Sequence, residues 1–169
     1  MSTIWKPSVT VAAIIERDQQ FLMIEEETVD GVRINQPAGH LDPGESLEQA
    51  VVRETLEETS FDFTPTALTG TYLSRFISST NGVDVTYLRF AFCGELGQQH
   101  QRPLDDGILR WLWMSYEELK ASQARHRSPL VMQCVDDYLA GQRAPLSVLK
   151  THPSALASAS INSSQQEKK

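Results

Sequence analysis

The residues with the clearest chemical potential in this 169-residue chain lie in one short acidic segment. Residues 41–62 hold seven acidic side chains and one basic one, so they carry −6 of the formal net charge of −7. Within them, Glu54, Glu57 and Glu58 have the i, i+3, i+4 spacing that places side chains on one face of a helix. Carboxylates are natural ligands of Mg²⁺, whose coordination is usually completed by water and substrate phosphates. The pattern indicates a cation site beside a phosphate-bearing substrate.

The same arrangement works against the helix that carries it. Repulsion between Glu54 and Glu58 costs ~0.2–0.5 kcal/mol. Glu57 and Glu58 also lie near the helix C-terminus, where the macrodipole disfavours negative charge by ~0.3–1 kcal/mol. Departures of this kind are expected where function requires them. The alternative interpretation is a solvated acidic face, and the loop before the helix argues against it.

The elements that position these acids can be predicted from the pattern of apolar residues and turn signals. We predict a helix over residues 46–59, with Ser46 as N-cap and Gln49 completing a capping box. A loop over residues 38–44, with a turn at Asp42-Pro43-Gly44, precedes it. Two more helices are predicted, one capped by Ser115 with Glu118 and one opening at Ser128-Pro129 and ending near Gly141. Strands are predicted over residues 8–15, 20–25, 32–36, 67–77, 83–96 and 109–114.

Strands and helices mix without strict alternation, which predicts an α+β fold with a mixed sheet flanked by helices. We expect the first two strands to pair, and the two long strands to be joined by a turn at Asn81-Gly82. Trp111 and Trp113 alternate on one strand face and are expected to pack. Residues 1–150 are predicted to form one domain, and the Ser/Ala/Gln/Lys-rich residues 151–169 a flexible tail.

Composition excludes several classes of protein. With 40% hydrophobic and 22% charged residues, the chain is typical of a soluble globular domain. The longest near-apolar run, residues 9–15, is far short of the ~20 residues that a membrane helix needs. The N-terminus has no apolar signal core, and Cys93 and Cys134 are expected to be reduced, so we predict a cytoplasmic location. Acids and bases nearly balance outside residues 41–62, so there is no basic footprint for nucleic-acid binding.

The loop and the acidic helix together resemble the Nudix box. Gly39 is followed after five residues by Glu45, and after seven more by Arg53-Glu54-Thr55-Leu56-Glu57-Glu58. Two positions depart from the box. Thr55 replaces an aliphatic residue that packs the helix on the sheet. Ser60 replaces the final glycine, where a left-handed backbone makes serine cost on the order of 1 kcal/mol.

This resemblance implies a Nudix-type α/β/α sandwich around a central mixed sheet. It also implies hydrolysis of a nucleoside diphosphate linked to another group, with Mg²⁺ or Mn²⁺ as cofactor. By position, Glu57 and Glu58 would ligate the metal, and Glu54 would ligate it or act as the base. The carbonyl of Gly39 is a further ligand candidate. Arg53 would complete the catalytic set with Glu54 and Glu57, and would pair with Glu45 to orient the helix.

Further segments between residues 6 and 146 resemble a bacterial phosphatase subgroup of the same family. The subgroup implies release of orthophosphate from nucleoside di- and triphosphates and from hydroxymethylpyrimidine pyrophosphate. The expected partner is therefore a small nucleotide or pyrophosphate, and the chain is expected to be a monomer or homodimer, without nucleic-acid or membrane partners. Two alternatives remain: a Nudix pyrophosphohydrolase acting on ADP-ribose or dinucleoside polyphosphates, and a nucleotide sensor that does not cleave.

Residues outside the box add weaker candidates. Arg89 lies in a strand and could reach a substrate phosphate, and a solvent-facing strand arginine is the alternative. Asp105 and Asp106 could supply a later carboxylate ligand or could simply be solvated. His40 lies inside the box loop and is expected to shape it. Tyr87 could stack on a base or pack at a sheet edge.

Overall fold

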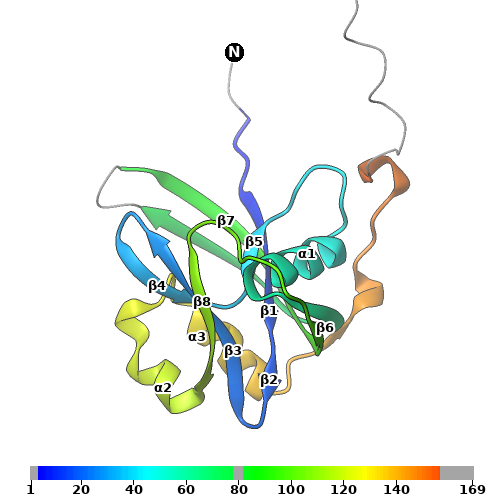
Figure 1. Ribbon diagram of the computed structural model, residues 1–169. Helices are drawn as coiled ribbons and strands as arrows, with labels where there is room; N and C mark the ends of the chain where they lie inside the picture. The colour runs from blue at the N-terminus through cyan, green and yellow to red at the C-terminus, as the bar shows by residue number, and fades with distance from the viewer. Residues whose placement is uncertain (1–3, 78–81, 157–169) are drawn as a thin grey trace, which may run out of the picture.

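The computed structural model describes residues 4–77 and 82–156, in which five strands form a mixed sheet (Figure 1). Its strand order is β5-β1-β7-β6-β9. The central pair β1 and β7 is parallel, and the other neighbours are antiparallel. The strands span, in sheet order, Ala38–His40, Ser8–Ile14, Asp84–Gln99, Phe61–Ile77 and Ala144–Pro145.

A second, antiparallel sheet stands beside the first. It contains β2 (Glu16–Arg17), β3 (Gln20–Thr28), β4 (Gly31–Asn35) and β8 (Ile108–Ser115). The expected pairing of residues 8–15 with 20–25 is wrong. Only the tip of that hairpin pairs, through β2 and β3, while β1 itself enters the mixed sheet between β5 and β7. Because β1 is buried on both faces, an interior position with a strand on each side suits it better than a hairpin.

Three α-helices and three short 3₁₀ turns complete the described residues. Ser46 and Ser115 both cap their helices, and the predicted capping boxes with Gln49 and Glu118 are confirmed. The α-helices are α1 (Leu47–Thr59), α2 (Tyr116–Ala121) and α3 (Leu130–Leu139). The 3₁₀ turns are η1 (Gln123–Arg125), η2 (Leu146–Val148) and η3 (Pro153–Ala155).

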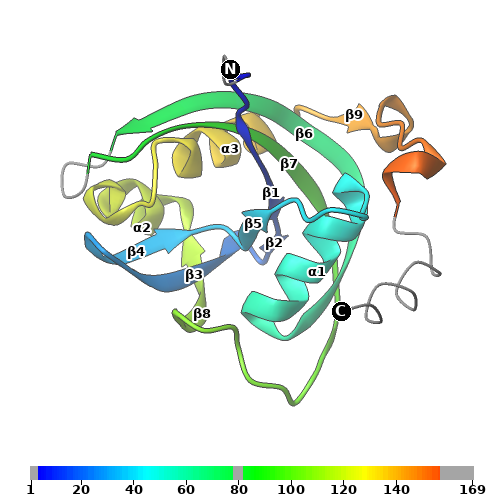
Figure 2. The same cartoon turned by 90° about the horizontal axis from the view of Figure 1, so that it is seen from above.

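Helices cover both faces of the mixed sheet, with α1 and α3 on opposite sides of β1 (Figure 2). Val11 and Ala13 of β1 pack with Ala50 and Val51 of α1, whereas Ile14 belongs to the core on the α3 side. Alternate residues of β1 therefore pack into two separate hydrophobic cores, one on each face of the sheet. This arrangement confirms the predicted α+β class and the α/β/α sandwich.

Several element boundaries differ from the sequence prediction. The strand β6 begins at Phe61, directly after α1, and passes Pro65 through β-bulges instead of starting at residue 67. The predicted loop over residues 38–44 contains the short strand β5. The long strands pair as expected up to Ile77 and Asp84, and Asn81 in the predicted turn lies outside the described residues.

The packing of the two tryptophans is confirmed, and Trp111 meets Phe61 edge-on with ring centroids 5.3 Å apart. Of the predicted tail, residues 151–156 are described, where η3 is followed by a bridge between Leu156 and Gly44. Residues 157–169 lie outside the described part, so the flexible tail stays a prediction. None of the helices in the described residues is long and apolar enough to cross a membrane.

Candidate active site

A cavity of about 900 Å³ is lined from α1, β3, β5, β7 and the start of α3. It brings together most of the residues that the sequence singled out. Those that line it are Gly39, Arg53, Glu54, Glu57, Glu58 and Arg89. Asp105, His40 and Tyr87 line it as well. Glu45 and Asp106 are not among its lining residues.

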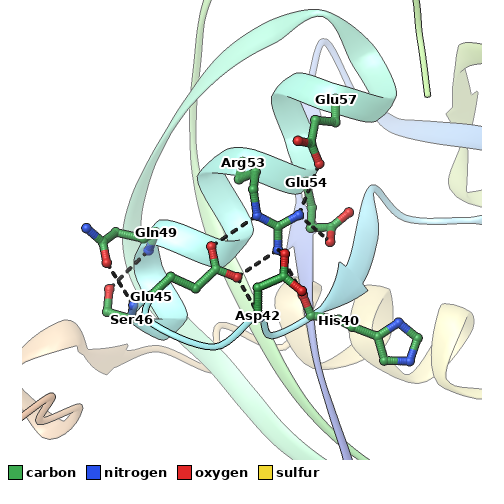
Figure 3. A network of polar contacts seen from close by, with 8 residues as sticks. All are labelled: His40, Asp42, Glu45, Ser46, Gln49, Arg53, Glu54 and Glu57. Atoms are coloured by element: carbon green, nitrogen blue, oxygen red, sulfur yellow. Dashed lines mark hydrogen bonds and ion pairs between the residues drawn. The ribbon is translucent and has the colours of Figure 1, made fainter. Parts of the chain in front are cut away.

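One arginine, Arg53, holds the acidic side of this cavity together (Figure 3). Its Nε and Nη2 atoms donate to the two carboxylate oxygens of Glu45 at 3.0 and 2.7 Å. Its Nη1 atom donates to Glu54 at 2.8 Å and to Glu57 at 3.0 Å, and Nη2 also donates to the carbonyl of His40 at 2.9 Å. Three carboxylates therefore accept hydrogen bonds from one guanidinium, and the carboxylate of Asp42 lies 3.6 Å from Nη2. The hydrogen bonds that Arg53 donates to Glu45 raise the pKa of Arg53, which stays charged.

Glu45 supports the network from outside the cavity. Its carboxylate accepts the two Arg53 bonds and a third from the backbone N–H of Asp42 at 2.8 Å. The hydrogen bonds from Arg53 hold the pKa of Glu45 below its usual range. The box loop and α1 are thus joined through a permanently ionised pair, which fixes the side of α1 that faces the cavity.

Glu58 is the most deeply buried of the three helix acids, with 7% of its surface exposed. One of its oxygens accepts a hydrogen bond from the Ala38 N–H at 2.7 Å. Burial raises the pKa of Glu58 to about 9, and the charges of Glu54, Glu26 and Asp105 act in the same direction. Burial also raises the pKa of Glu54, against the opposing effect of Arg53. Glu54, Glu57 and Glu58 form an acidic wall of the cavity. Negative charge is costly on this wall unless a cation binds beside it.

Gly39 is required by close packing against Glu54. A Cβ atom at position 39 would lie 2.1 Å from the Glu54 carboxyl carbon and 2.2 Å from both of its oxygens. Real atoms do not approach so closely, so any side chain here would displace the Glu54 carboxylate. The glycine lets the backbone of β5 and the Glu54 carboxylate line the same corner of the cavity.

The donor set on this wall fits a hard divalent cation. Carboxylate oxygens and a backbone carbonyl are the ligand types that Mg²⁺ and Mn²⁺ prefer. Within residues 4–77 and 82–156, however, no three acidic, histidine or cysteine side chains already converge at metal-binding distances. Arg53 engages one oxygen each of Glu54 and Glu57, so a cation on this wall would compete with the guanidinium for these two carboxylates.

Comparison with known proteins agrees with this geometry. The family model of the NUDIX domain matches residues 6–134, which is most of the chain. The chain belongs to the Nudix family. The phosphatase NudJ of Escherichia coli K12 and that of Shigella boydii are each 40% identical to this Nudix protein over 151 residues, covering 86% of this chain and 92% of theirs. The chain is a Nudix hydrolase similar to these phosphatases.

Solved structures extend the comparison to the fold. A NUDIX hydrolase from Nitrosomonas europaea is 50% identical, with a TM-score of 0.81 over 88% of this chain and 99% of the other. The NUDIX domain of Shewanella oneidensis NrtR, solved in complex with ADP ribose, is 16% identical, with a TM-score of 0.63 over 82% of this chain and 90% of the other. At that identity the likeness concerns the fold alone.

The two departures from the Nudix box are both accommodated locally. Thr55 is buried, and its hydroxyl donates to the carbonyl of Val51 at 2.8 Å, so this hydroxyl has a hydrogen-bond partner. Ser60 ends α1 in the left-handed conformation, with φ of 64° and ψ of 11°. The helix therefore ends as a glycine would end it, with serine bearing the strain.

The side of the cavity away from α1 contains residues that the sequence analysis missed or misplaced. Glu26 and Asn35 line the cavity, although Glu26 lies just outside the predicted strand over residues 20–25 and Asn35 lies inside the one over residues 32–36. Arg89 is only 7% exposed, so the interpretation of a solvent-facing arginine is wrong. Alternation along the strands could have placed these side chains on one face, but the face of each strand that meets the cavity depends on how the two sheets lie together.

Proposed function

We propose that this Nudix hydrolase cleaves a phosphoanhydride bond in nucleoside di- and triphosphates and in hydroxymethylpyrimidine pyrophosphate, releasing orthophosphate with Mg²⁺ as cofactor. Mn²⁺ is the expected substitute. The observation that carries the proposal is the acidic wall, in which Glu54, Glu57 and Glu58 face one cavity next to Gly39. The 40% identity to the phosphatase NudJ supports the release of phosphate, and the choice of substrates rests on the resemblance of the sequence to that subgroup.

In this proposal Glu57 and Glu58 hold the cation with the carbonyl of Gly39. The cation, when bound, neutralises phosphate charge and lowers the pKa of the attacking water. Glu54 either ligates it or accepts the proton from the water. Arg53 keeps Glu54 and Glu57 on the cavity side of α1, because its other bonds tie it to Glu45 and His40. Without a cation the acidic wall would repel a polyphosphate, so metal dependence should be absolute.

The decisive experiment is a product assay over a substrate panel, with Mg²⁺ and with a chelator. The panel contains ADP, ATP, hydroxymethylpyrimidine pyrophosphate, ADP-ribose and a dinucleoside polyphosphate. We expect orthophosphate from the first three with Mg²⁺ and none with chelator. Phosphorus NMR in ¹⁸O-labelled water then identifies the phosphorus that is attacked.

Two outcomes would overturn the proposal. Nucleoside monophosphates formed from ADP-ribose or from the dinucleoside polyphosphate, without orthophosphate from ADP or ATP, would favour a pyrophosphohydrolase. Failure to cleave any member of the panel would favour a nucleotide sensor. The retention of all three helix acids beside Arg53 supports cleavage, because a module that only binds nucleotide has no need of them.

We also propose the cytoplasm as the site of action. Cys93 and Cys134 are both free and buried. Reduced thiols of this kind are typical of the cytoplasm, where disulfides are rare. Fractionation of cells that produce the protein tests this, and recovery outside the cytoplasmic fraction would contradict it.

A further inference from the structure

Arg89 is a buried cation without a carboxylate partner. Its surface is 7% exposed, and it lines the cavity from the middle of β7. In the described part of the chain, no Asp or Glu oxygen lies within 4.0 Å of its guanidinium, whereas the cavity's other arginines, Arg53, Arg75 and Arg127, each have one. Burying a guanidinium without a counter-charge is expensive, and folding alone gives no reason to retain it.

Two neutral amides hold the guanidinium in place. Arg89 Nη1 donates to the Gln36 side-chain oxygen at 3.4 Å, and Nη2 donates to that of Asn35 at 3.5 Å. Both amides are anchored from behind, because Gln36 donates to the carbonyl of Val131 at 2.8 Å and Asn35 donates to Glu26 at 3.3 Å. The amide oxygens therefore orient the guanidinium over long, weak bonds and leave its charge uncancelled.

The neighbouring groups that could cancel this charge are engaged or neutral. Glu26 is the acid whose charge acts on Arg89, but it lies within 3.5 Å of Arg127 and accepts the bond from Asn35. Burial raises the pKa of the Cys134 thiol, even though Arg89 opposes the shift, so the thiol remains uncharged at neutral pH. The positive charge of Arg89 is consequently available to a ligand in the cavity.

The position of Arg89 in the sheet relates it to the acidic wall. Arg89 and His40 are both register partners of Thr10, so two strand spacings of ~4.8 Å separate them. His40 directly follows Gly39, whose neighbour across the cavity corner is Glu54. Arg89 and the acidic wall line the same cavity, so a substrate with two linked phosphates can present one to the acidic wall and another to Arg89.

We propose that Arg89 binds the substrate phosphate next to the one at the acidic wall, and that its neutral cradle of Asn35 and Gln36 keeps the guanidinium available for that phosphate. This inference rests on the proposed function and assigns a substrate-binding role to one residue within it. Its core is electrostatic: the cradle keeps Arg89 charged and unpaired so that a phosphate supplies the missing counter-charge.

The test moves a carboxylate next to Arg89 without removing the arginine. In the double variant Glu26→Gln with Asn35→Asp, the acid and the amide exchange positions, so the cluster keeps its net charge and its mutual hydrogen bond. We expect the KM for ADP to rise about 10- to 100-fold, because the new aspartate replaces the phosphate as partner of the guanidinium. We expect kcat to change less than threefold. The single variant Glu26→Gln removes the original carboxylate without placing a new one at position 35. Its KM for ADP should therefore change less than that of the double variant.

Arg89→Gln removes the charge directly and should raise KM to a similar extent, with Arg110→Gln, an arginine outside the cavity, as the control for loss of a positive charge. A purely structural Arg89 predicts a different result: Arg89→Gln lowers the melting temperature, and the exchange variant leaves KM within threefold of wild type. That pattern overturns the inference. If Arg89→Gln does not fold, the exchange variant decides alone.

Binding of inorganic pyrophosphate and of orthophosphate, each with Ca²⁺ and followed by calorimetry, gives a readout that does not depend on turnover. We expect pyrophosphate to bind more tightly than orthophosphate to the wild type, and the difference to shrink at least tenfold in the exchange variant. An unchanged difference overturns the role of Arg89. Absence of cleavage across the substrate panel, by contrast, overturns the proposed function while this binding result still tests Arg89.

Discussion

Two of the arginines that line the cavity are in opposite electrostatic situations. On the α1 side, Arg53 is surrounded by acids and hydrogen-bonds to Glu45, Glu54 and Glu57. On the β7 side, the partners of Arg89 among the described residues are neutral: the amide oxygens of Asn35 and Gln36 and the thiol of Cys134. The first arginine lies in an excess of negative charge, and the second lacks any directly paired negative charge among the described residues.

The difference between these two sides shows what the cavity can accept. Burial, and then the charges of Glu54, Glu26 and Asp105, raise the pKa of Glu58, so the acidic wall favours a cation. The Arg89 side is short of negative charge, so it favours an anion. A divalent cation bound to a diphosphate supplies both at once. The net charge of −7 conceals this division, because it sums over walls that need opposite partners.

The largest expected effect comes from breaking the acidic wall at Glu57. Glu57→Gln keeps the shape of the side chain but removes a charge that the proposed cation needs. Metal catalysis contributes several kcal/mol, so we expect kcat to fall about 10³-fold while the fold survives. Glu48→Gln is the matched control, because Glu48 lies on the same helix but does not line the cavity. Full activity of Glu57→Gln would show that the ligand assignment is incorrect.

A smaller effect is expected from shifting the acidic wall without changing its charge. In Gly39→Ala, the added methyl group would lie within 2.2 Å of the Glu54 carboxylate, which must move aside. A displacement of about 1 Å in a catalytic group can cost about 10²-fold in rate, and we expect a loss of that order. Because Glu54 is a flexible side chain, the melting temperature should change little.

Steady-state kinetics and a thermal melt, carried out together, check the Gly39→Ala prediction. A calorimetric Mg²⁺ titration of the variant identifies whether the loss lies in metal affinity. A variant that melts far below the wild type would indicate that Gly39 serves the fold and not the position of Glu54.

The ion pairs of Glu25 lie outside the cavity and serve as a comparison for Arg53 and Arg89, because we expect them to stabilise the fold without affecting catalysis. The Glu25 side chain is 8% exposed and accepts hydrogen bonds from Arg110 and Arg125. The bond from Arg110, the largest effect, and that from Arg125 hold the pKa of Glu25 below its usual range. Its contribution to stability is therefore complete above the unfolded-state pKa of about 4.3 and is lost as the pH falls through the lower folded-state value.

Glu25→Gln should accordingly lower the free energy of unfolding at pH 7 by about 1 kcal/mol, a value reduced by the partial exposure of both arginines. Below about pH 4 the difference from the wild type should shrink. Urea unfolding at pH 7 and pH 3.5 measures both effects, with the exposed Glu27→Gln as control. A pH-independent difference would mean that the ion pairs do not stabilise the fold, and a large loss of kcat would place Glu25 with the cavity residues.

The sequence predicted the acidic wall far better than the Arg89 side, for a physical reason. Glu54, Glu57 and Glu58 lie on one helix, so their spacing alone places them together. Arg89 and Asn35 come from two different sheets, and their meeting depends on β1 leaving its expected hairpin to pair with β7. That long-range choice has no local signal, because a buried apolar strand fits either neighbour.

The smallest effect concerns the end of the helix that carries the acidic wall, where serine replaces the expected glycine. Ser60 has a left-handed backbone, which costs a residue with a Cβ atom about 1 kcal/mol, and its hydroxyl gains only a 3.2 Å hydrogen bond to the Arg102 carbonyl. Ser60→Gly should therefore raise the melting temperature by about 1–3 °C and leave kcat unchanged. Ser60→Ala separates the two contributions, because it loses the hydroxyl and keeps the strain, so it should melt below the wild type. If the glycine and alanine variants melt together, the backbone at position 60 carries no strain, and the end of α1 is held by its contacts alone.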